Sequence, residues 1–297
     1  MRIPNVTIST GVIQRLNRLK LRQNVLNDEI ATGQKISSAS DDPQAAVRVM
    51  RLRSEKMALQ QYSQNVDKLT GLAQASFASL NRLKTLSDRS GELAASASGI
   101  ASEAERKAYA TELNEMIKSA IEQVNTKFNG DYIFSGQKTD ASSFTAAGTA
   151  AKPSTVTFDN TGGDTTKVRV SDTLEISAGT SETENGQLAT FINNLIALRD
   201  AMESNSSSGI ASARTALISS EDDIVNAISQ NGAVQTRLEA LKQQNDSRFG
   251  DVEQLVSREV DADLAQSMVK LSQTQTAYQA AVQSGAQIMK LSLLDYV

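Results

Sequence analysis

Carboxylates are the main groups in this sequence that could perform chemistry, because the chain contains neither histidine nor cysteine. A pair of carboxylates is the catalytic apparatus of a glycoside hydrolase, and Asp261 and Asp263 are close enough in sequence to suggest one. Residues two apart on a helix, however, point to different faces. We therefore expect Asp261 and Asp263 to cap or border a helix, and we expect no catalytic residue and no enzymatic activity.

The other acidic pair, Asp41 and Asp42, could be interpreted as a metal or acid/base site, but the neighbouring Pro43 favours a helix start. Asp42 can accept hydrogen bonds from the free amides of a first turn, where proline loses nothing by lacking an N–H. Ser102 and Glu105 form an S-x-x-E capping box. Without His or Cys, and without a GxxxxGK[ST] loop, no metal or cofactor is predicted.

Composition excludes several other classes of function. The net charge of −4 and pI near 5.1 argue against nucleic acid, whose phosphates need a basic surface. No window approaches eighteen uninterrupted apolar residues, so no transmembrane helix is predicted. The first 30 residues have no apolar core segment and no small-residue cleavage site, so no Sec signal peptide is expected.

The two ends of the chain each carry apolar residues at alternating steps of four and three, which is the pattern of a coiled coil. Gln23 occupies one position of the N-terminal series in place of an apolar residue, and Gln275 and Gly285 occupy two positions of the C-terminal series. We interpret Val260 to Leu294 as one long helix and expect an assembly interface of paired terminal helices. Its predicted residues are Val12, Leu16, Leu19, Leu26, Ile30, Val260, Leu264, Met268, Leu271, Tyr278, Val282, Met289 and Leu293.

Opposite charges at the two ends favour the same pairing. Residues 1–35 contain six basic and two acidic side chains, a net charge of +4. Residues 250–297 contain three basic and six acidic side chains, a net charge of −3. Charges of this kind determine which helices pair and in which register, and they contribute little to the stability of the pair. Packing of the N-terminal helix into an ordinary core remains the alternative.

Between the ends, the sequence predicts a mainly α fold: an elongated rod of long antiparallel helices with terminal coiled-coil helices and a small β-rich insertion. One helix runs from Asp41 to about Ala97, one from Ser102 to Phe128, one from Gln187, and one from Ile210 toward Phe249. The expected domains are an N-terminal assembly region (1–40), two rod halves (41–135 and 186–250), an outward-facing insertion (136–185) and a C-terminal assembly region (251–297).

Short strands are expected within and just before the insertion. They are predicted at Tyr132–Phe134, Thr155–Phe158, Lys167–Val170 and Leu174–Ile176, where apolar and β-branched residues stand between Gly, Ser, Thr and Asp. The segment Asn160–Asp164 suits a hairpin turn between the second and third of these strands. The turn Asn129–Asp131 is expected to end the preceding helix.

Several short motifs together resemble the flagellin superfamily over nearly the whole chain except the insertion. They are Met1–Ile3, Gly33–Ile36, Ser40–Pro43 followed by Arg51–Arg53, Asn125-Thr126 with Tyr132–Gly136, Asp261–Ala265 and Ser292–Val297. Within the superfamily the chain is most similar to the hook-associated proteins of the hook–filament junction. The resemblance implies terminal regions that are disordered in the monomer and form a coiled coil on assembly.

The resemblance also implies a function and partners. The protein would be a structural component of the bacterial flagellum, exported through the flagellar type III apparatus to the cell exterior. It would self-associate in a ring, with the other junction protein on the hook side, flagellin on the filament side and an export chaperone at its C-terminal region. Filament flagellin is the nearest alternative, and an intracellular coiled-coil scaffold is a further one.

Overall fold

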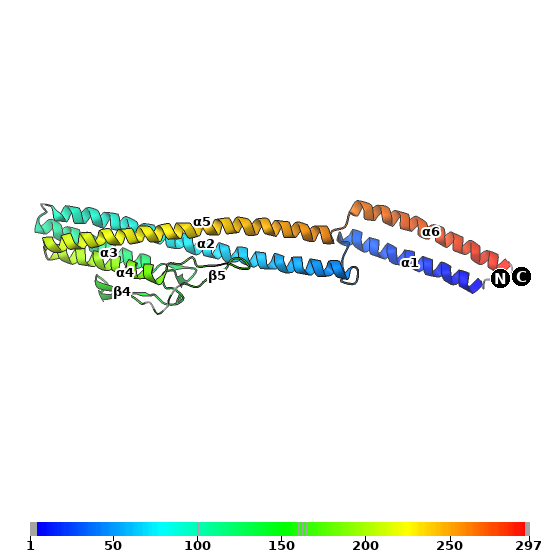
Figure 1. Ribbon diagram of the computed structural model, residues 1–297, viewed down its shortest axis with the longest axis horizontal. Coiled ribbons are helices and arrows are strands. Elements are labelled where there is room, and N and C mark those ends of the chain that lie inside the picture. The colour runs from blue at the N-terminus through cyan, green and yellow to red at the C-terminus, as the bar shows by residue number, and fades with distance from the viewer. Residues whose placement is uncertain (1–4, 100, 160, 162, 164, 295–297) are drawn as a thin grey trace. The chain divides into compact units, whose positions relative to one another are not determined.

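The computed structural model describes residues 5–99, 101–159, 161, 163 and 165–294, with side chains described between residues 10 and 287. The chain divides into two compact units (Figure 1). One comprises Met1–Ala58 and Arg248–Val297, and the other comprises Leu59–Ser247. We call them the terminal unit and the central unit. The fold class predicted from the sequence, mainly α with a small β-rich insertion, is confirmed.

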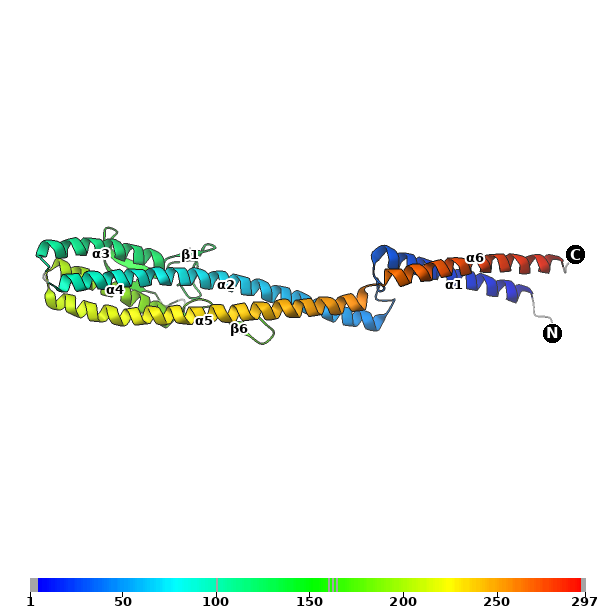
Figure 2. The same ribbon diagram turned by 90° about the horizontal axis from the view of Figure 1, so that it is seen from above.

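Helices of the central unit surround one large apolar core. Parts of α2 (Pro43–Ser98) and α5 (Ser207–Val260) lie beside α3 (Glu103–Val124) and α4 (Glu182–Glu203) (Figures 1 and 2). All four helices contribute fully buried side chains, such as Leu80, Leu113, Leu195 and Ile210. Farther along α2 and α5, a second cluster joins Val66 and Leu69 to Leu238. Most of the apolar burial in the described chain therefore lies in this unit.

Helix starts follow the predicted caps. The Asp42 Oδ1 atom accepts hydrogen bonds from the amides of Gln44 and Ala45 at 3.0 and 2.9 Å, and Pro43 is the first residue of α2. Ser102 and Glu105 form a complete capping box at the start of α3. Ser181 and Glu184 form another at α4, which begins five residues before the predicted Gln187. This second S-x-x-E motif is visible in the sequence and was missed.

The strands pair differently from the prediction. Helix α3 ends at Val124, not Phe128, because Lys127–Phe128 (β1) pairs with Asp131–Tyr132 (β2) around Asn129 and Gly130, which both have positive φ. Strand β4 (Lys152–Phe158) pairs with β3 (Phe144–Thr149), which was not predicted. Strand β5 (Val168–Arg169) pairs with β6 (Glu175–Ile176). The proposed β4–β5 hairpin is therefore wrong; its turn residues 160, 162 and 164 lie outside the described residues.

The β3–β4 hairpin is attached to α3 and α4 by polar clamps. The Asn193 side chain accepts from the Val156 N–H and donates to the Val156 carbonyl, both at 2.8 Å, as a neighbouring strand would. The guanidinium of Arg199, which is only 1% exposed, donates to the Pro153 carbonyl at 2.6 Å and to Asn114 Oδ1 at 3.1 Å. One face of the hairpin is thus part of the core, while Thr155 and Thr157 on the other face are exposed.

The terminal unit consists of two antiparallel helix pairs. Helix α1 (Asn5–Thr32) contacts α6 (Leu264–Leu294), and the two lie side by side in both views (Figures 1 and 2). The start of α2 lies against the end of α5, with Val49, Val252 and Val260 buried. Ion pairs join this second pair at Arg48–Glu259, Lys56–Glu253 and Glu55–Arg248, with N–O distances of 3.0, 2.7 and 2.6 Å.

Arg199→Met should lower the free energy of unfolding of the central unit by about 2–4 kcal/mol, because the buried Pro153 carbonyl and the Asn114 side chain lose their donor. Chemical denaturation followed by circular dichroism measures the change. Arg214→Met, at an exposed position on α5, is the matched control and should change stability by less than about 0.5 kcal/mol. Equal stability of the two variants would contradict the clamp.

Candidate assembly interface

The N-terminal half of the predicted interface is oriented as expected. Leu26 is buried at 4% exposure, and the other predicted residues of α1 are partly buried. Gln23, which fills the missing slot, is also partly buried. These residues form one stripe of α1 that is turned toward α6, and we call the contact zone between the two helices the seam. The partly buried residues named from the sequence are Val12, Leu16, Leu19 and Ile30.

The C-terminal half of the predicted interface is buried only in part. Leu271 and Tyr278 are partly buried, but Leu264, Met268 and Val282 are 43%, 55% and 43% exposed. The prediction of one continuous helix from Val260 is wrong. Helix α5 ends at Val260, the chain leaves helical geometry at Asp261–Asp263, and α6 begins at Leu264. Met289 and Leu293 belong to the last turns of α6, whose side chains lie outside the described residues.

Small and polar residues on α6 occupy the places that apolar residues were expected to fill. Ser267 and Thr274 are buried at 5% and 7% exposure, Ala281 is partly buried, and Gly285 is buried. Together with Leu271 and Tyr278 they repeat at steps of four and three, the spacing of a coiled-coil seam. The sequence analysis placed Gly285 in the series but missed Ser267, Thr274 and Ala281, because it selected Met268, Gln275 and Val282, each one residue later, which are exposed.

The two acids at the helix break have the structural roles that the sequence suggested. Asp263 Oδ1 accepts from the Gln266 amide at 3.0 Å and so caps α6, while Asp261 accepts from the Ser257 hydroxyl. Backbone hydrogen bonds then connect the break to the end of α1: Lys35 N–H donates to the Val260 carbonyl and Ala262 N–H to the Gly33 carbonyl, both at 2.8 Å. Gly33 has a φ of 71° and closes α1.

Charge does not hold α1 to α6 in the way the sequence suggested. Asp251, Glu253 and Glu259 belong to α5, and α6 contains no acidic residue. Among the described side chains, no ion pair joins α1 to α6, and a polar contact between them is the hydrogen bond that the Ser267 hydroxyl donates to Glu29 at 3.0 Å. The predicted attraction between oppositely charged terminal helices is therefore wrong for this pair, because the helix break assigns the acids to α5.

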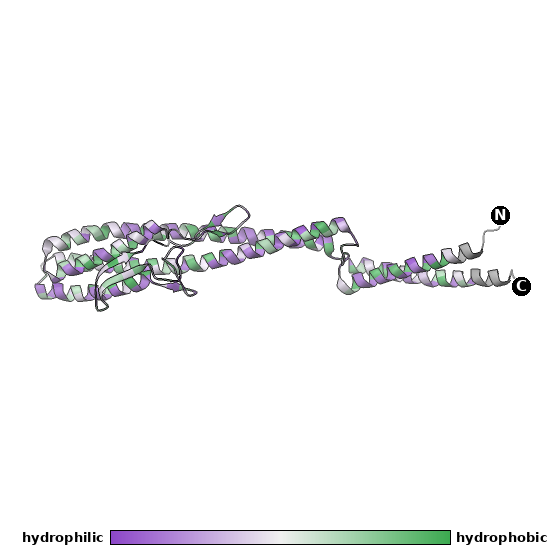
Figure 3. Ribbon diagram, turned by 90° about the horizontal axis from the view of Figure 1, so that it is seen from below, coloured by the Kyte–Doolittle hydropathy of each residue, from purple (hydrophilic) through white to green (hydrophobic). Residues whose placement is uncertain are grey.

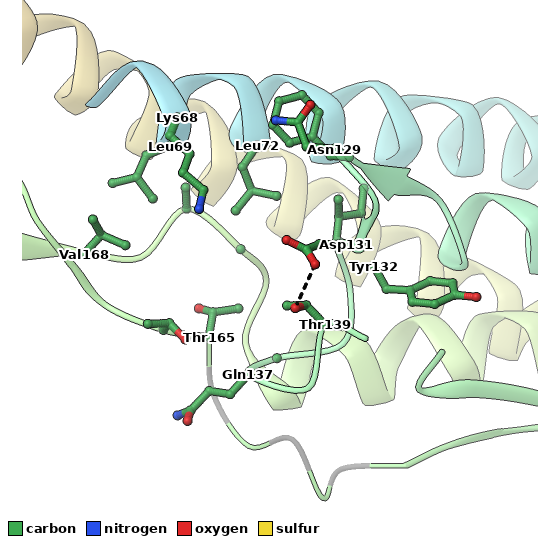
Figure 4. Close-up of a pocket in the computed structure, with 16 residues that line it drawn as sticks. Lys68, Leu69, Leu72, Asn129, Asp131, Tyr132, Gln137, Thr139, Thr165 and Val168 are labelled. Carbon is green, nitrogen blue, oxygen red and sulfur yellow. Dashed lines mark hydrogen bonds between the residues drawn. The ribbon is translucent and has the colours of Figure 1, made fainter. Parts of the chain in front are cut away.

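The central unit also contains a cavity. It has a volume of about 270 Å³ and lies between α2 and the β1–β2 hairpin, with Leu69, Leu72 and Phe128 among its apolar lining residues (Figure 4). Lys68 and Asp131 supply charge, and Asp131 accepts from the Thr139 hydroxyl at 3.1 Å. This arrangement holds no recognisable nucleophile–base pair, so we assign it no chemistry.

Metal and membrane sites were also sought in the part of the chain that the structure describes. No cluster of three or more acidic side chains suited to a metal ion occurs there. None of the described helices combines the length and the apolar character that a membrane span requires.

Comparison with known proteins gives the family of the N-terminal half. Residues 7–139 match the model of the bacterial flagellin N-terminal helical region. This stretch of the chain is therefore similar to the flagellin N-terminal helical region. This region extends over α1, α2, α3 and the β1–β2 hairpin, and it confirms the resemblance to the flagellin superfamily. No match was found among curated proteins.

Solved structures show that about three quarters of the chain resembles the fold of flagellar hook-associated proteins. A putative flagellar hook-associated protein from Vibrio parahaemolyticus is 19% identical, with a TM-score of 0.65 over 74% of this chain and 100% of that one. Bacillus cereus FlgL is 18% identical, with a TM-score of 0.58 over 72% and 100%. Xanthomonas campestris FlgL is 13% identical, with a TM-score of 0.53 over 70% and 99%.

Gly285→Ala should weaken the α1–α6 seam, although alanine normally stabilises a helix by about 1 kcal/mol over glycine. A Cβ at residue 285 would lie 2.8 Å from Val12 Cγ1, a contact that the stiff valine side chain cannot relieve by bending. Amide hydrogen exchange in residues 10–16 and 281–287 should become faster. Val12→Ala in the same chain should reverse the effect.

Gly232→Ala is the matched control for this substitution, because a Cβ there meets nothing within 4 Å. It should slow amide exchange near residue 232 in α5. Slower exchange of α1 and α6 in Gly285→Ala would show that the two helices do not approach each other as closely as the structure indicates.

Two carboxylates next to the helix break should titrate below their ordinary values. The Ser38 N–H lowers the pKa of Asp41 from 3.8, and the Arg48 guanidinium lowers the pKa of Glu259 from 4.5. Folding lowers the pKa of each carboxyl group. The stability that these groups contribute is therefore fully present when the pH is above their pKa in the unfolded chain, and it is lost as the pH falls through their pKa in the folded chain. Carboxyl NMR titration measures both. Arg48→Gln should raise the pKa of Glu259 toward its ordinary value and leave the pKa of Asp41 low; a Glu259 pKa that Arg48→Gln leaves unchanged would contradict the pairing.

Proposed function

We propose that this chain is a structural protein of the bacterial flagellum that self-associates through the outer sides of α1 and α6. The observation that carries the proposal is the apolar stripe that α6 leaves uncovered. Leu264, Met268 and Val282 recur at steps that keep them on one side of the helix, and all are exposed. We call these three residues the α6 stripe.

The composition of α6 makes the uncovered stripe unusual. Its 31 residues include two charged side chains, Lys270 and Lys290. Exposed apolar residues on α1, namely Ile13, Leu21 and Val25, add to the uncovered surface and are 55%, 64% and 56% exposed. Hydrophobic and hydrophilic residues alternate around both helices in Figure 3. Exposed apolar surface of this kind is typical of a protein–protein interface, and a second copy of the same chain is the partner that family membership favours.

A position at the junction between hook and filament is the specific form of this proposal. Asp42 followed by Pro43, and the ending Ser292–Val297, favour a hook-associated protein over filament flagellin, in which an alanine usually follows the acids. The fold similarity to the putative flagellar hook-associated protein of Vibrio parahaemolyticus supports the same choice. The partners we propose are further copies in a ring, the other junction protein on the hook side and flagellin on the filament side.

Export and location follow from the same proposal. The protein would leave the cell through the flagellar type III apparatus and act outside it, and an export chaperone would bind its C-terminal region. The proposed role is structural and not enzymatic. Helical ends that complete their packing only on assembly would give up conformational entropy at that step and would need the contacts of the α6 stripe to offset it.

Met268→Asp on the α6 stripe and Leu271→Asp in the seam should both prevent assembly, for different reasons. Met268→Asp places a charge in the proposed contact between copies and leaves the α1–α6 pair of a single chain intact. Leu271→Asp places a charge in the seam itself, as does Leu19→Asp on α1. Complementation of a non-flagellate deletion strain, scored by filament length and motility, measures assembly, and hydrogen exchange of the monomer measures the pair.

Thr157→Ala and Arg169→Ala are controls on the exposed side of the insertion. Both variants should assemble normally, and all variants should be exported and retain the folded central unit. Filaments of normal length on cells carrying Leu19→Asp or Leu271→Asp would contradict the proposed function. A block caused by the Thr157 or Arg169 variant would show that the insertion takes part in assembly.

A further inference from the structure

Three arginines on α1 form an exposed cationic surface that has no partner in the described part of the chain. Arg15, Arg18 and Arg22 follow each other at steps of three and four residues, which places them along one side of the helix. All three are exposed, and none takes part in an ion pair or side-chain hydrogen bond with another described residue. We call them the arginine surface.

The neighbouring helix cannot neutralise this surface, because α6 contains no acidic residue. Outside the N-terminal segment the chain is acidic as a whole. Residues 1–35 carry a net charge of +4 within a total of −4, so residues 36–297 carry −8. A second copy of this chain therefore presents the arginine surface with a predominantly acidic partner.

Two carboxylates on α5 match the arginine surface in spacing. Glu239 and Asp246 are exposed and stand seven residues apart, which is two helical turns or about 10.5 Å. Arg15 and Arg22 have the same separation. Neither carboxylate forms an ion pair in the structurally described chain.

The basic residues near Glu239 and Asp246 do not cancel their charge. Lys242, which lies between them, bonds to Asp67 on α2 at 2.6 Å and attracts Asp246 only at longer range. Arg237 stands two residues before Glu239 and so points to a different side of α5. An uncompensated pair of negative charges is left on this side of the helix.

We propose that Arg15 and Arg22 of one copy form ion pairs with Glu239 and Asp246 of a neighbouring copy, with Arg18 adding to the attraction. The inference rests on the proposed self-association and specifies which polar surfaces meet. Exposed ion pairs add little affinity individually, so their role is to select the neighbour and fix its register while the α6 stripe supplies apolar burial.

Cross-linking in assembled flagella tests the contact directly, because the chain has no cysteine of its own. Two forms of the full chain, one with Gln14→Cys beside the arginine surface and one with Gln243→Cys beside Glu239, are co-expressed in cells lacking the native copy. Both positions are exposed. Oxidation should give a dimer that contains one copy of each form, and neither form alone should give it.

Charge reversal adds specificity to this test. Arg15→Glu with Arg22→Glu on the first form should lower the dimer yield by about tenfold, since two attractive pairs become repulsive. Glu239→Arg with Asp246→Arg on the second form should restore it. Lys20→Glu on α1 and Asp222→Arg on α5 are exposed controls and should leave the yield within about twofold of the starting value.

The outcomes distinguish this inference from the proposed function. Absence of the unmodified protein from isolated flagella would overturn both. Normal incorporation without the cross-link, or a yield that charge reversal leaves unchanged, would overturn only the arginine contact. Loss of binding to phosphatidylserine vesicles by the Arg15 and Arg22 variant, with the cross-link retained, would instead assign the arginine surface to anionic lipid and would also overturn the inference.

Discussion

The seam between α1 and α6 buries too little apolar surface to hold two helices of 28 and 31 residues together firmly in water. Leu26 is the large apolar side chain on α1 that is fully buried there, and Ser267, Thr274 and Gly285 occupy much of the opposite side. Apolar residues that would normally strengthen such a pair, including Leu21 and Met268, are exposed instead. The terminal helices are thus matched to each other in shape but remain incomplete as a hydrophobic unit.

The central unit shows the opposite balance. Its four helices bury a continuous set of large side chains, and the buried Arg199 and the Asn193 side chain attach the β3–β4 hairpin through specific hydrogen bonds. A stable central unit next to a weakly packed pair of terminal helices allows the terminal helices to exchange partners without unfolding the centre. This difference in packing is what the proposed assembly role requires.

How much could be predicted from the sequence depended on whether the signal was local. The cap at Asp42 and the capping box at Ser102 are set by neighbouring residues, and both were found. The inward side of α1 was also found, because the helix is uninterrupted from Asn5 to Thr32. On α6 the same method was right for Leu271, Tyr278 and Gly285 and wrong at the positions between them, where it followed apolar side chains and the seam uses the smaller residue one position earlier.

Strand pairing was less predictable because it depends on contacts distant in sequence. Phe144–Thr149 lacks alternation of apolar and polar residues and forms a strand only because β4 pairs with it and Asn193 holds β4 in place. Surface charge was misleading for a related reason: the carboxylates expected to face α1 belong to α5, where Glu253 and Glu259 pair with α2. The role of these residues in assembly remains a prediction. The structure shows only which of them are buried between α1 and α6 and which are exposed.

Amide hydrogen exchange of the purified monomer and of the assembled protein tests the central claim most directly. In the monomer, residues 10–32 and 264–287 should exchange on the order of a hundredfold faster than the core segments of α2 and α4, because their seam is incomplete. On assembly these same residues should become protected to nearly the level of the core. Equal protection of the terminal helices and the core in the monomer, or no gain on assembly, would contradict the account.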